Sequence, residues 1–240
     1  NHGMDRKSMI IALGGGVTGD MAGFAAAIYM RGIRFVQIPT TLLSQSDSSV
    51  GGKTGIDFGG AKNILGAFHQ PALVYINVNT LKSLPKREFS SGMGEVIKHG
   101  IIQDKSFFDF ISNNAKKIKE LDSETMILMS ERNCAIKAHI VEEDEKENGK
   151  RALLNFGHTI GHAIEAASDF KLTHGECIGL GFRAASYIAL GRGMISREEL
   201  LNTENLMKLY DLSLSTEIKD KQEISELMKK DKKNQNGALK

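Results

Sequence analysis

The chain has 240 residues, of which 41% are hydrophobic and 25% are charged, the composition of a folded protein with one large or two small domains. This composition excludes disordered, collagen-like and coiled-coil chains. Because 31 Lys+Arg stand against 29 Asp+Glu, the net charge of +2 indicates neither a nucleic acid nor an anionic membrane surface as a partner.

The first part of the chain has the pattern of a parallel α/β fold. Apolar runs at 9–13, 35–38 and 73–78 predict buried parallel strands. Small and apolar residues at helical spacing predict a helix over 20–30. The stretch 44–60 is rich in Ser, Gly and Asp, so we expect a loop there.

From residue 85 onward the apolar spacing is helical. Helices are predicted over 91–102, 107–118, 123–142, 158–167, 176–190, 197–210 and 222–228, with a charged, solvated connection over 142–150. We therefore predict a Rossmann-like α/β parallel-sheet domain over 1–89 and an all-α domain over 90–240. Ligands favour such boundaries between domains, so we expect the functional site there.

Several features bear on the setting of the protein. The longest apolar run is far shorter than the ~20 residues that a membrane helix needs. Two cysteines, Cys134 and Cys177, are too few for a disulfide scaffold and suggest a reducing compartment, so we predict a cytoplasmic protein.

The chain opens with Asn1 rather than Met and ends soon after a turn-like segment at 234–237. We interpret it as a fragment whose sheet domain is truncated at its N-terminus.

A glycine-rich segment, GGGVTGD at 14–20, lies between the first predicted strand and the first predicted helix. Glycines let the backbone approach an anion, and a helix N-terminus offers free N–H groups. The segment departs from the dinucleotide pattern G-x-G-x-x-G, so two interpretations remain, a pyrophosphate cradle or a tight connection. Asp20 could cap the helix or bind a ligand hydroxyl.

Further polar residues follow the predicted strands. Thr40 and Thr41 come after the second strand, and Lys53, Lys62 and Asn63 lie in the Gly/Ser-rich stretch and just after it. Because ligands bind at the carboxyl edge of parallel strands, these residues together favour a ligand site. For Lys53 alone, a solvated loop lysine is the commoner case.

The helical part contains a candidate metal site. His158 and His162 are four residues apart, which places both imidazoles on one helical face. With Glu95, two histidines would leave one coordination position open, as catalytic zinc requires. A pair of surface histidines is the alternative, and spacing does not decide which two of His99, His158, His162 and His174 would bind.

The motifs add up to a known family. The matching stretches are 12–20, 29–32, 37–43, 47–53, 62–63, 92–98, 153–162 and 174–175. In order and spacing they closely resemble the dehydroquinate synthase family of sugar-phosphate cyclases through nearly the whole chain. The resemblance implies an enzyme that uses NAD and a divalent metal, usually zinc, with cobalt as the alternative. Its reaction converts 3-deoxy-D-arabino-heptulosonate 7-phosphate into 3-dehydroquinate and phosphate.

The resemblance also implies roles for individual residues. The metal ligands would be Glu95, His158 and His174, with His162 facing the substrate and His99 structural. The NAD site would comprise Gly15, Gly16, Val17, Thr18, Gly19, Asp20, Thr40, Thr41, Lys53, Lys62, Thr80, Leu81, Lys82 and Ser83. Substrate would be held and processed by Asp47, Lys53, Asn63, Lys98, Lys137, Arg151, Asn155 and His162. Arg31 would reach into the neighbouring subunit's site, which implies a homodimer, and Lys232 or Lys233 would bind the substrate carboxylate.

Three alternatives remain. A sibling cyclase, such as a 2-deoxy-scyllo-inosose or 2-epi-5-epi-valiolone synthase, would share the fold, NAD and the metal. A metal-dependent polyol dehydrogenase would release NADH, and an inactive fragment would serve as a binding module. Arg151 and Asn155 favour the dehydroquinate enzyme, because the stretch around them varies among the siblings. Family members have further sequence before Asn1 and after Lys240, from which this chain departs.

Overall fold

The computed structural model describes residues 3–59, 61–147, 149–218 and 220–229, with only the backbone for residues 61 and 62. Its sheet contains the three predicted parallel strands in the order β1-β2-β5, which are β1 (Met9–Gly14), β2 (Arg34–Pro39) and β5 (Leu73–Val74). The third strand is shorter than predicted. Asn77 accepts a hydrogen bond from the Asn79 N–H and so begins the 3-10 helix η3 (Val78–Ser83).

The first helix, α1 (Gly16–Ile28), packs on this sheet and is followed by the short 3-10 helix η1 (Tyr29–Arg31). The helix begins at Gly16, not at residue 20 as predicted. Its glycines had suggested a loop, but they lie within the helix and allow it to pack closely on its neighbours. A Cβ at Gly19 would lie 2.6 Å from Gln37 Oε1, and one at Gly23 would lie 2.5 Å from Thr54 Cγ2. Glycine is therefore required where α1 touches β2 and the segment that contains Thr54.

The loop predicted over 44–60 is wrong. It contains a π-helical turn, η2 (Ser44–Ser48), and the strand β3 (Lys53–Phe58), which pairs antiparallel with β4 (Ala61–Phe68). Much of this two-stranded ribbon is exposed, so its strands lack the continuous apolar run of a buried parallel strand. The ribbon is defined by the backbone hydrogen bonds between its two strands, and a pattern of apolar residues does not reveal such pairing.

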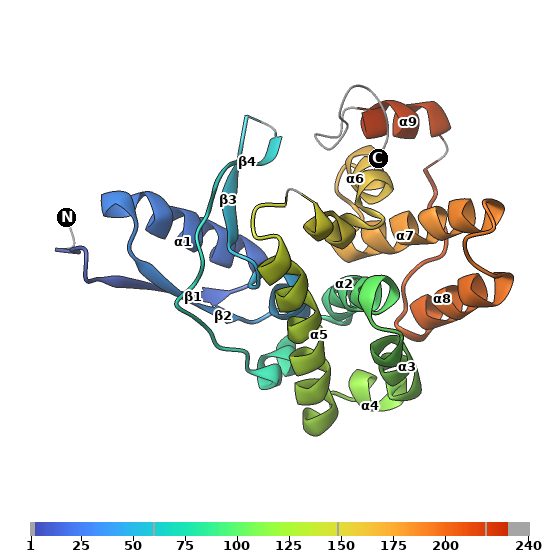
Figure 1. Ribbon diagram of the computed structural model, residues 1–240, viewed down its shortest axis with the longest axis horizontal. Coiled ribbons are helices and arrows are strands. Elements are labelled where there is room, and N and C mark those ends of the chain that lie inside the picture. Colours follow the sequence, from blue (N-terminus) through green and yellow to red (C-terminus); the bar gives the residue numbers. More distant parts are fainter. Residues whose placement is uncertain (1–2, 60, 148, 219, 230–240) are drawn as a thin grey trace.

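The helical prediction is confirmed for most elements (Figure 1). The elements are α2 (Lys86–Gln103), α3 (Lys105–Asn113), α4 (Ala115–Lys119), α5 (Ser123–Glu143), η4 (Lys150–Asn155), α6 (His158–Ala167), α7 (His174–Gly191), α8 (Arg197–Leu209) and α9 (Lys221–Lys229). The single helix predicted over 107–118 is two helices, because the chain turns at Asn114, whose Nδ2 donates to Phe110 O at 2.9 Å. α2 begins earlier than predicted, directly after Pro85, which fits the rigid backbone of proline at a helix start.

One apolar core connects the two parts of the molecule. It holds Met93 and Ile97 of α2 together with Leu42, which follows β2, and Leu81 of η3. Figure 1 shows the sheet and α1 on one side, α6 to α9 on the other, and α2 and α5 between them. The predicted division at 89/90 remains a prediction, since the core is shared across it.

Both cysteines, Cys134 and Cys177, are free thiols. None of the helices in the described ranges is long and apolar enough to cross a membrane.

Helices α2 and α7 cross at a point where no side chain fits. The Gly175 N–H donates to Ser91 Oγ at 3.1 Å, and a Cβ at Gly175 would lie 1.7 Å from Ser91 O. We expect Gly175→Ala to lower the free energy of unfolding by about 3 kcal/mol, because the two backbones must separate. A Cβ at Gly191 of the same helix would meet no described residue within 4 Å, so Gly191→Ala is expected to be neutral or to stabilise by up to ~0.5 kcal/mol. Urea unfolding followed by circular dichroism measures both, and equal stabilities would contradict the close crossing.

Candidate active site

Three donor groups from three helices meet in the helical part. Glu95 lies in α2, while His158 and His174 are the first residues of α6 and α7. Glu95 Oε1 is 3.6 Å from His158 Nε2 and 3.5 Å from His174 Nε2. The ligand atoms of the three residues all lie within 4.8 Å of one another. The structure thus brings together the three ligands that the family resemblance implied.

Close helix crossings produce this meeting. A Cβ at Gly94 of α2 would lie 2.6 Å from Gly175 O, and a Cβ at Gly181 of α7 would lie 2.0 Å from Gly157 O. Each of the three donor residues stands next to Gly94, Gly157 or Gly175 in the sequence. Because the backbones touch at these glycines, the neighbouring side chains converge.

The spacing of the donors fits a divalent metal. In a tetrahedral site with bonds of about 2.1 Å, adjacent ligand atoms are about 3.4 Å apart, close to the distances around Glu95 Oε1. This oxygen is buried and has no hydrogen-bond partner among the described residues. An unsatisfied buried carboxylate oxygen is costly in a protein interior, and a cation would satisfy it. Three protein donors would leave one position open for substrate.

Electrostatics favour the metal-binding forms of two donors. Burial raises the pKa of Glu95, but the Lys98 ammonium and the nearby imidazoles hold it well below its usual range, so the carboxylate is anionic. Burial and the Lys98 charge lower the pKa of His158, so its ring is neutral. Burial also lowers the pKa of His174, but the Glu165 and Glu95 carboxylates outweigh this and raise it to about 9. Metal binding would therefore release a proton from His174.

Two further residues border the cluster. The His162 ring centroid is 5.2 Å from that of His158, and Glu165 Oε2 is 3.8 Å from His174 Nδ1. A carboxylate behind a histidine that binds a metal would orient its ring, so Glu165 is a further candidate site residue, one that the sequence analysis missed. Its position in the helix, seven residues after His158, was the available signal.

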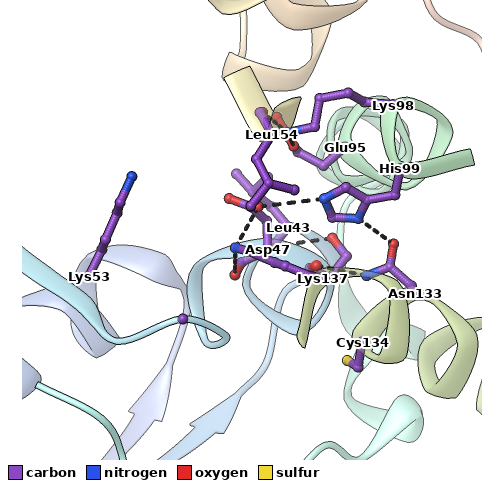
Figure 2. A network of polar contacts seen from close by, with 12 residues as sticks. Leu43, Asp47, Lys53, Glu95, Lys98, His99, Asn133, Cys134, Lys137 and Leu154 are labelled. Carbon is purple, nitrogen blue, oxygen red and sulfur yellow. Dashed lines mark hydrogen bonds and ion pairs between the residues drawn. The ribbon is translucent and has the colours of Figure 1, made fainter. Parts of the chain in front are cut away.

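Several residues of the predicted substrate site lie near the donors. Lys137 Nζ donates to Asp47 Oδ1 at 2.7 Å, and the Lys98 ammonium contacts Glu95 and donates to Leu154 O at 2.7 Å. Figure 2 shows the Asp47–Lys137 pair close to Glu95 and Lys98, with Lys53 standing apart.

The remaining predicted substrate residues lie around the 3-10 helix η4. Buried Arg151 donates from Nη2 to Gly51 O at 2.9 Å. Lys53 and Asn155 both contact Glu147. The connection predicted over 142–150 is mostly exposed in its described residues, as expected, but the Glu147 side chain is only 22% exposed and contacts two candidate site residues.

Some of the predicted cofactor residues lie together at the carboxyl edge of the sheet. The Thr40 N–H donates to Gly14 O at 2.9 Å, and a Cβ at Gly15 would lie 3.2 Å from Thr41 Cγ2. Thr80 is tied to the same edge by Gln45, whose Nε2 donates to Thr80 Oγ1 at 3.0 Å and to Pro39 O at 3.1 Å. The sequence analysis missed Gln45, since nothing in its local sequence marks it.

Other predicted residues are placed differently. The Leu81 side chain packs in the apolar core, so only its backbone can line a cofactor site, while Lys82 and Ser83 are exposed. Arg31 lies away from the cluster, in a cavity of about 620 Å³ that Arg6, Arg34 and His69 also line. The side chain of Lys62 and both Lys232 and Lys233 lie outside the described part of the chain.

A second cavity, of about 300 Å³, brings together Asp20, Lys53 and Asn63. Burial, with the Asp47 carboxylate adding to it, raises the pKa of Asp20 to about 7. A raised carboxyl pKa means that the folded state binds a proton more tightly than the unfolded state. Asp20 therefore contributes stability at low pH that is lost as the pH rises from about 4 to about 7.

Asp20→Asn should remove this loss. We expect the stability of the variant relative to the wild type to increase between pH 4 and pH 7 and then to level off. Urea midpoints measured across this range test the expectation. Asp109→Asn, which removes an exposed carboxylate on α3, is the matched control. A flat difference for Asp20→Asn would show that Asp20 titrates normally.

Comparison with known proteins places the chain in a family. The model of the 3-dehydroquinate synthase N-terminal family matches residues 1–91, and that of the 3-dehydroquinate synthase C-terminal family matches residues 92–234. The 3-dehydroquinate synthase of Ruminiclostridium cellulolyticum is 59% identical over 208 residues, 86% of this chain and 58% of that protein. The enzyme of Acetivibrio thermocellus is 54% identical over 230 residues, 96% of this chain and 64% of that protein. The chain thus spans about three-fifths of these relatives.

Solved structures agree on the fold. The 2-epi-5-epi-valiolone synthase of Streptomyces hygroscopicus subsp. jinggangensis 5008, with NAD⁺ and Zn²⁺ bound, has a TM-score of 0.88 at 28% identity, over 94% of this chain and 64% of that chain. A 2-deoxy-scyllo-inosose synthase complexed with carbaglucose-6-phosphate, NAD⁺ and Co²⁺ has a TM-score of 0.82 at 30% identity, over 94% and 62%. The fold prediction, a parallel-sheet part followed by a helical part, is confirmed. From both family models and from the identities to its relatives, the chain belongs to the 3-dehydroquinate synthase family.

Proposed function

We propose that this chain carries the catalytic centre of a 3-dehydroquinate synthase, a phosphate-eliminating cyclase of the shikimate pathway that leads to chorismate and the aromatic amino acids. Its substrate would be 3-deoxy-D-arabino-heptulosonate 7-phosphate and its products 3-dehydroquinate and phosphate. The observation that carries the proposal is the convergence of the Glu95, His158 and His174 donors with the buried ammonium groups of Lys98 and Lys137. A polyol dehydrogenase needs the donors but has no phosphate to neutralise.

Two cofactors would serve the reaction. Glu95, His158 and His174 would hold Zn²⁺ or Co²⁺. NAD would lie along the carboxyl edge of the sheet, over the start of α1 and beside Thr40, Thr41, Lys53, Lys62 and η3. When bound, NAD would supply a hydride acceptor for the C5 carbinol and would later return the hydride, and the metal would supply Lewis acidity toward the hydroxyl at that carbon. The 2-epi-5-epi-valiolone synthase solved with NAD⁺ and Zn²⁺ and the 2-deoxy-scyllo-inosose synthase solved with NAD⁺ and Co²⁺ support this choice.

The residues of the chain would mainly bind and orient the substrate. Asp47, kept anionic by Lys137, accepts a hydrogen bond from a substrate hydroxyl. Lys98, Arg151 and His162 supply positive charge and hydrogen bonds to the substrate's anionic groups, and Asn63 and Asn155 add neutral contacts. Such preorganised charges stabilise the departing phosphate without reorganisation during the reaction.

Phosphate elimination needs little other acid–base chemistry from the protein. Once C5 is a ketone, the proton on the neighbouring carbon is acidic, and the phosphate group of the substrate can take this proton as it leaves. After C5 has been reduced back to a carbinol, the ring opens, and an intramolecular aldol step closes the carbocycle. The protein's contribution is to hold the substrate in the reactive geometry.

The proposal is tested by phosphate release from 3-deoxy-D-arabino-heptulosonate 7-phosphate, with NAD and Zn²⁺ present, by the protein expressed from its full reading frame. Phosphate release without net NADH, and dehydroquinate as product, is expected. A different carbocycle formed only from another sugar phosphate would indicate a sibling cyclase, and NADH accumulation on polyols would indicate a dehydrogenase. No turnover on any of these substrates would favour the inactive binding module.

The assembly and setting are part of the same proposal. A homodimer would allow Arg31, remote from the donors of its own chain, to complete the neighbouring subunit's site. The protein would act in the cytoplasm, where its two thiols stay reduced. Sedimentation equilibrium tests the dimer, and the activity of mixed Arg31→Ala and Lys98→Met subunits tests the shared site. Partial recovery of activity on mixing is expected, and no recovery would oppose an Arg31 contribution across the interface.

A further inference from the structure

One buried polar pair lies behind the proposed substrate residues and has no part in the reaction described above. His99 of α2 and Asn133 of α5 are both fully buried, and His99 Nδ1 lies 2.8 Å from Asn133 Oδ1. Asn133 Nδ2 donates to Ser46 O at 2.7 Å. The pair therefore connects two helices to η2, the turn that carries Asp47 (Figure 2).

These contacts fix the proton on the His99 ring. A backbone carbonyl can only accept hydrogen bonds, so the side of Asn133 that faces Ser46 O must be its NH₂ group. The opposite side, Oδ1, is an acceptor, and the ring nitrogen next to it must carry the proton. His99 is therefore the Nδ1–H tautomer. Burial, with the Lys98 ammonium adding to it, lowers the pKa of His99 to about 4, so the ring is neutral and Nε2 carries a lone pair.

This lone pair faces Asp47. His99 Nε2 is buried, has no hydrogen-bond partner in the part of the chain that the structure describes, and lies 4.0 Å from Asp47 Oδ1. Asp47 Oδ1 instead accepts from Lys137, and the Asp47 side chain remains 27% exposed. The opposite tautomer would place an N–H donor against this carboxylate. A cation between Asp47, Glu95 and His99 is disfavoured, because the Lys137 ammonium already pairs with Asp47 Oδ1 at 2.7 Å.

We propose that His99 is a positioning residue: Asn133 fixes its tautomer so that Nε2 offers Asp47 no proton, and the Asp47 carboxylate stays available to a substrate hydroxyl. The inference deepens the proposed function, on which the role of Asp47 rests. His99 acts through Asp47 and does not touch the substrate.

The tautomer can be observed without any turnover. In the chain labelled with ¹⁵N at histidine, long-range ¹H–¹⁵N correlation distinguishes protonated from unprotonated ring nitrogens. The signals that vanish in His99→Asn belong to His99. We expect a protonated Nδ1 and an unprotonated Nε2, and a protonated Nε2 would overturn the proposal whatever the protein catalyses.

Two variants test the consequence for the substrate. The Gln amide in His99→Gln can place an N–H₂ donor where Nε2 stood, whereas the shorter Asn in His99→Asn reaches only the Nδ1 position. We expect His99→Gln to raise KM for the phosphosugar about tenfold with kcat little changed, since it engages the Asp47 carboxylate in a charge-assisted hydrogen bond. His99→Asn should raise KM by less than about threefold, and metal content and NAD affinity should match the wild type in both.

The order of the two variants separates the explanations. If His99 only fills space, the smaller Asn will be the more damaging replacement, and the proposal fails. If Nε2 binds substrate directly, His99→Asn will again be the worse variant, with a loss in kcat. If the wild-type protein does not turn over the phosphosugar at all, the proposed function fails, while the tautomer measurement still decides the structural half of this inference.

Discussion

Glu95→Gln is expected to remove the metal and with it the activity. The amide is a far weaker ligand than the carboxylate, and Glu95 Oε1 is the atom that both His158 Nε2 and His174 Nε2 approach. Metal content should fall from about one ion per chain to near zero. Phosphate release should fall by at least about a thousandfold, as when a main electrostatic contribution to the transition state is lost.

Metal analysis after dialysis and the phosphate assay together check this expectation. Glu131→Gln, which changes an exposed carboxylate on α5, is the control and should retain both metal and activity. Circular dichroism establishes that each variant is folded. A folded Glu95→Gln protein that keeps one equivalent of metal would place the metal elsewhere, for example at His162, Glu165 and His174, which form another group of close donors.

Lys137→Met is expected to lower the free energy of unfolding strongly. The Lys137 side chain is 7% exposed and its ammonium pairs with Asp47 Oδ1 at 2.7 Å. Removing the ammonium leaves the Asp47 carboxylate largely desolvated and unpaired, which costs about 3 kcal/mol in the free energy of unfolding. Lys105→Met breaks the exposed Lys105–Asp109 pair, whose side chains are 83% and 50% exposed, and should cost less than about 0.5 kcal/mol.

The same pair predicts a pH dependence. Burial raises the pKa of Asp47, but the Lys137 ammonium outweighs burial and holds the pKa well below its usual range. A depressed carboxyl pKa contributes stability that is present above the ordinary Asp pKa of about 4 and is lost as the pH falls further. The gap between wild type and Lys137→Met should therefore be widest near neutrality and shrink in acid. Urea midpoints at several pH values measure it, and a gap that widens in acid would contradict the ion pair.

Sequence patterns predict the elements that bury apolar faces. The strands at 9–14 and 34–39 and the long helices follow from continuous or helically spaced apolar residues. The β3–β4 ribbon could not be predicted in this way, because much of it is exposed and its order comes from backbone pairing with a segment that is itself polar. The start of α1 was missed for the opposite reason, since its glycines have the composition of a loop but serve helix packing.

The types of residue in the candidate site could be predicted from the sequence, but which of these residues contact one another could be predicted less well. The i, i+4 spacing drew attention to His158 and His162, yet His174 is the histidine that shares Glu95 Oε1 with His158. The choice of His174 came from family resemblance, not from spacing. Glu147 contacts Lys53 across 94 positions of sequence, and Asn133 contacts Ser46 across 87. Contacts of this range depend on how helices cross, which no local pattern encodes.

The glycine crossings between α2, α6 and α7 have a consequence for how the protein tolerates change. Gly94, Gly157 and Gly175 have no side chain that could take part in chemistry, yet each fixes the direction of a neighbouring donor. In a mutational scan scored by metal retention, these positions should be as intolerant as the donors themselves. Loss of metal at these glycines would reflect disturbed helix packing and not the loss of a ligand. A list of ligands drawn from such a scan alone would therefore be too long.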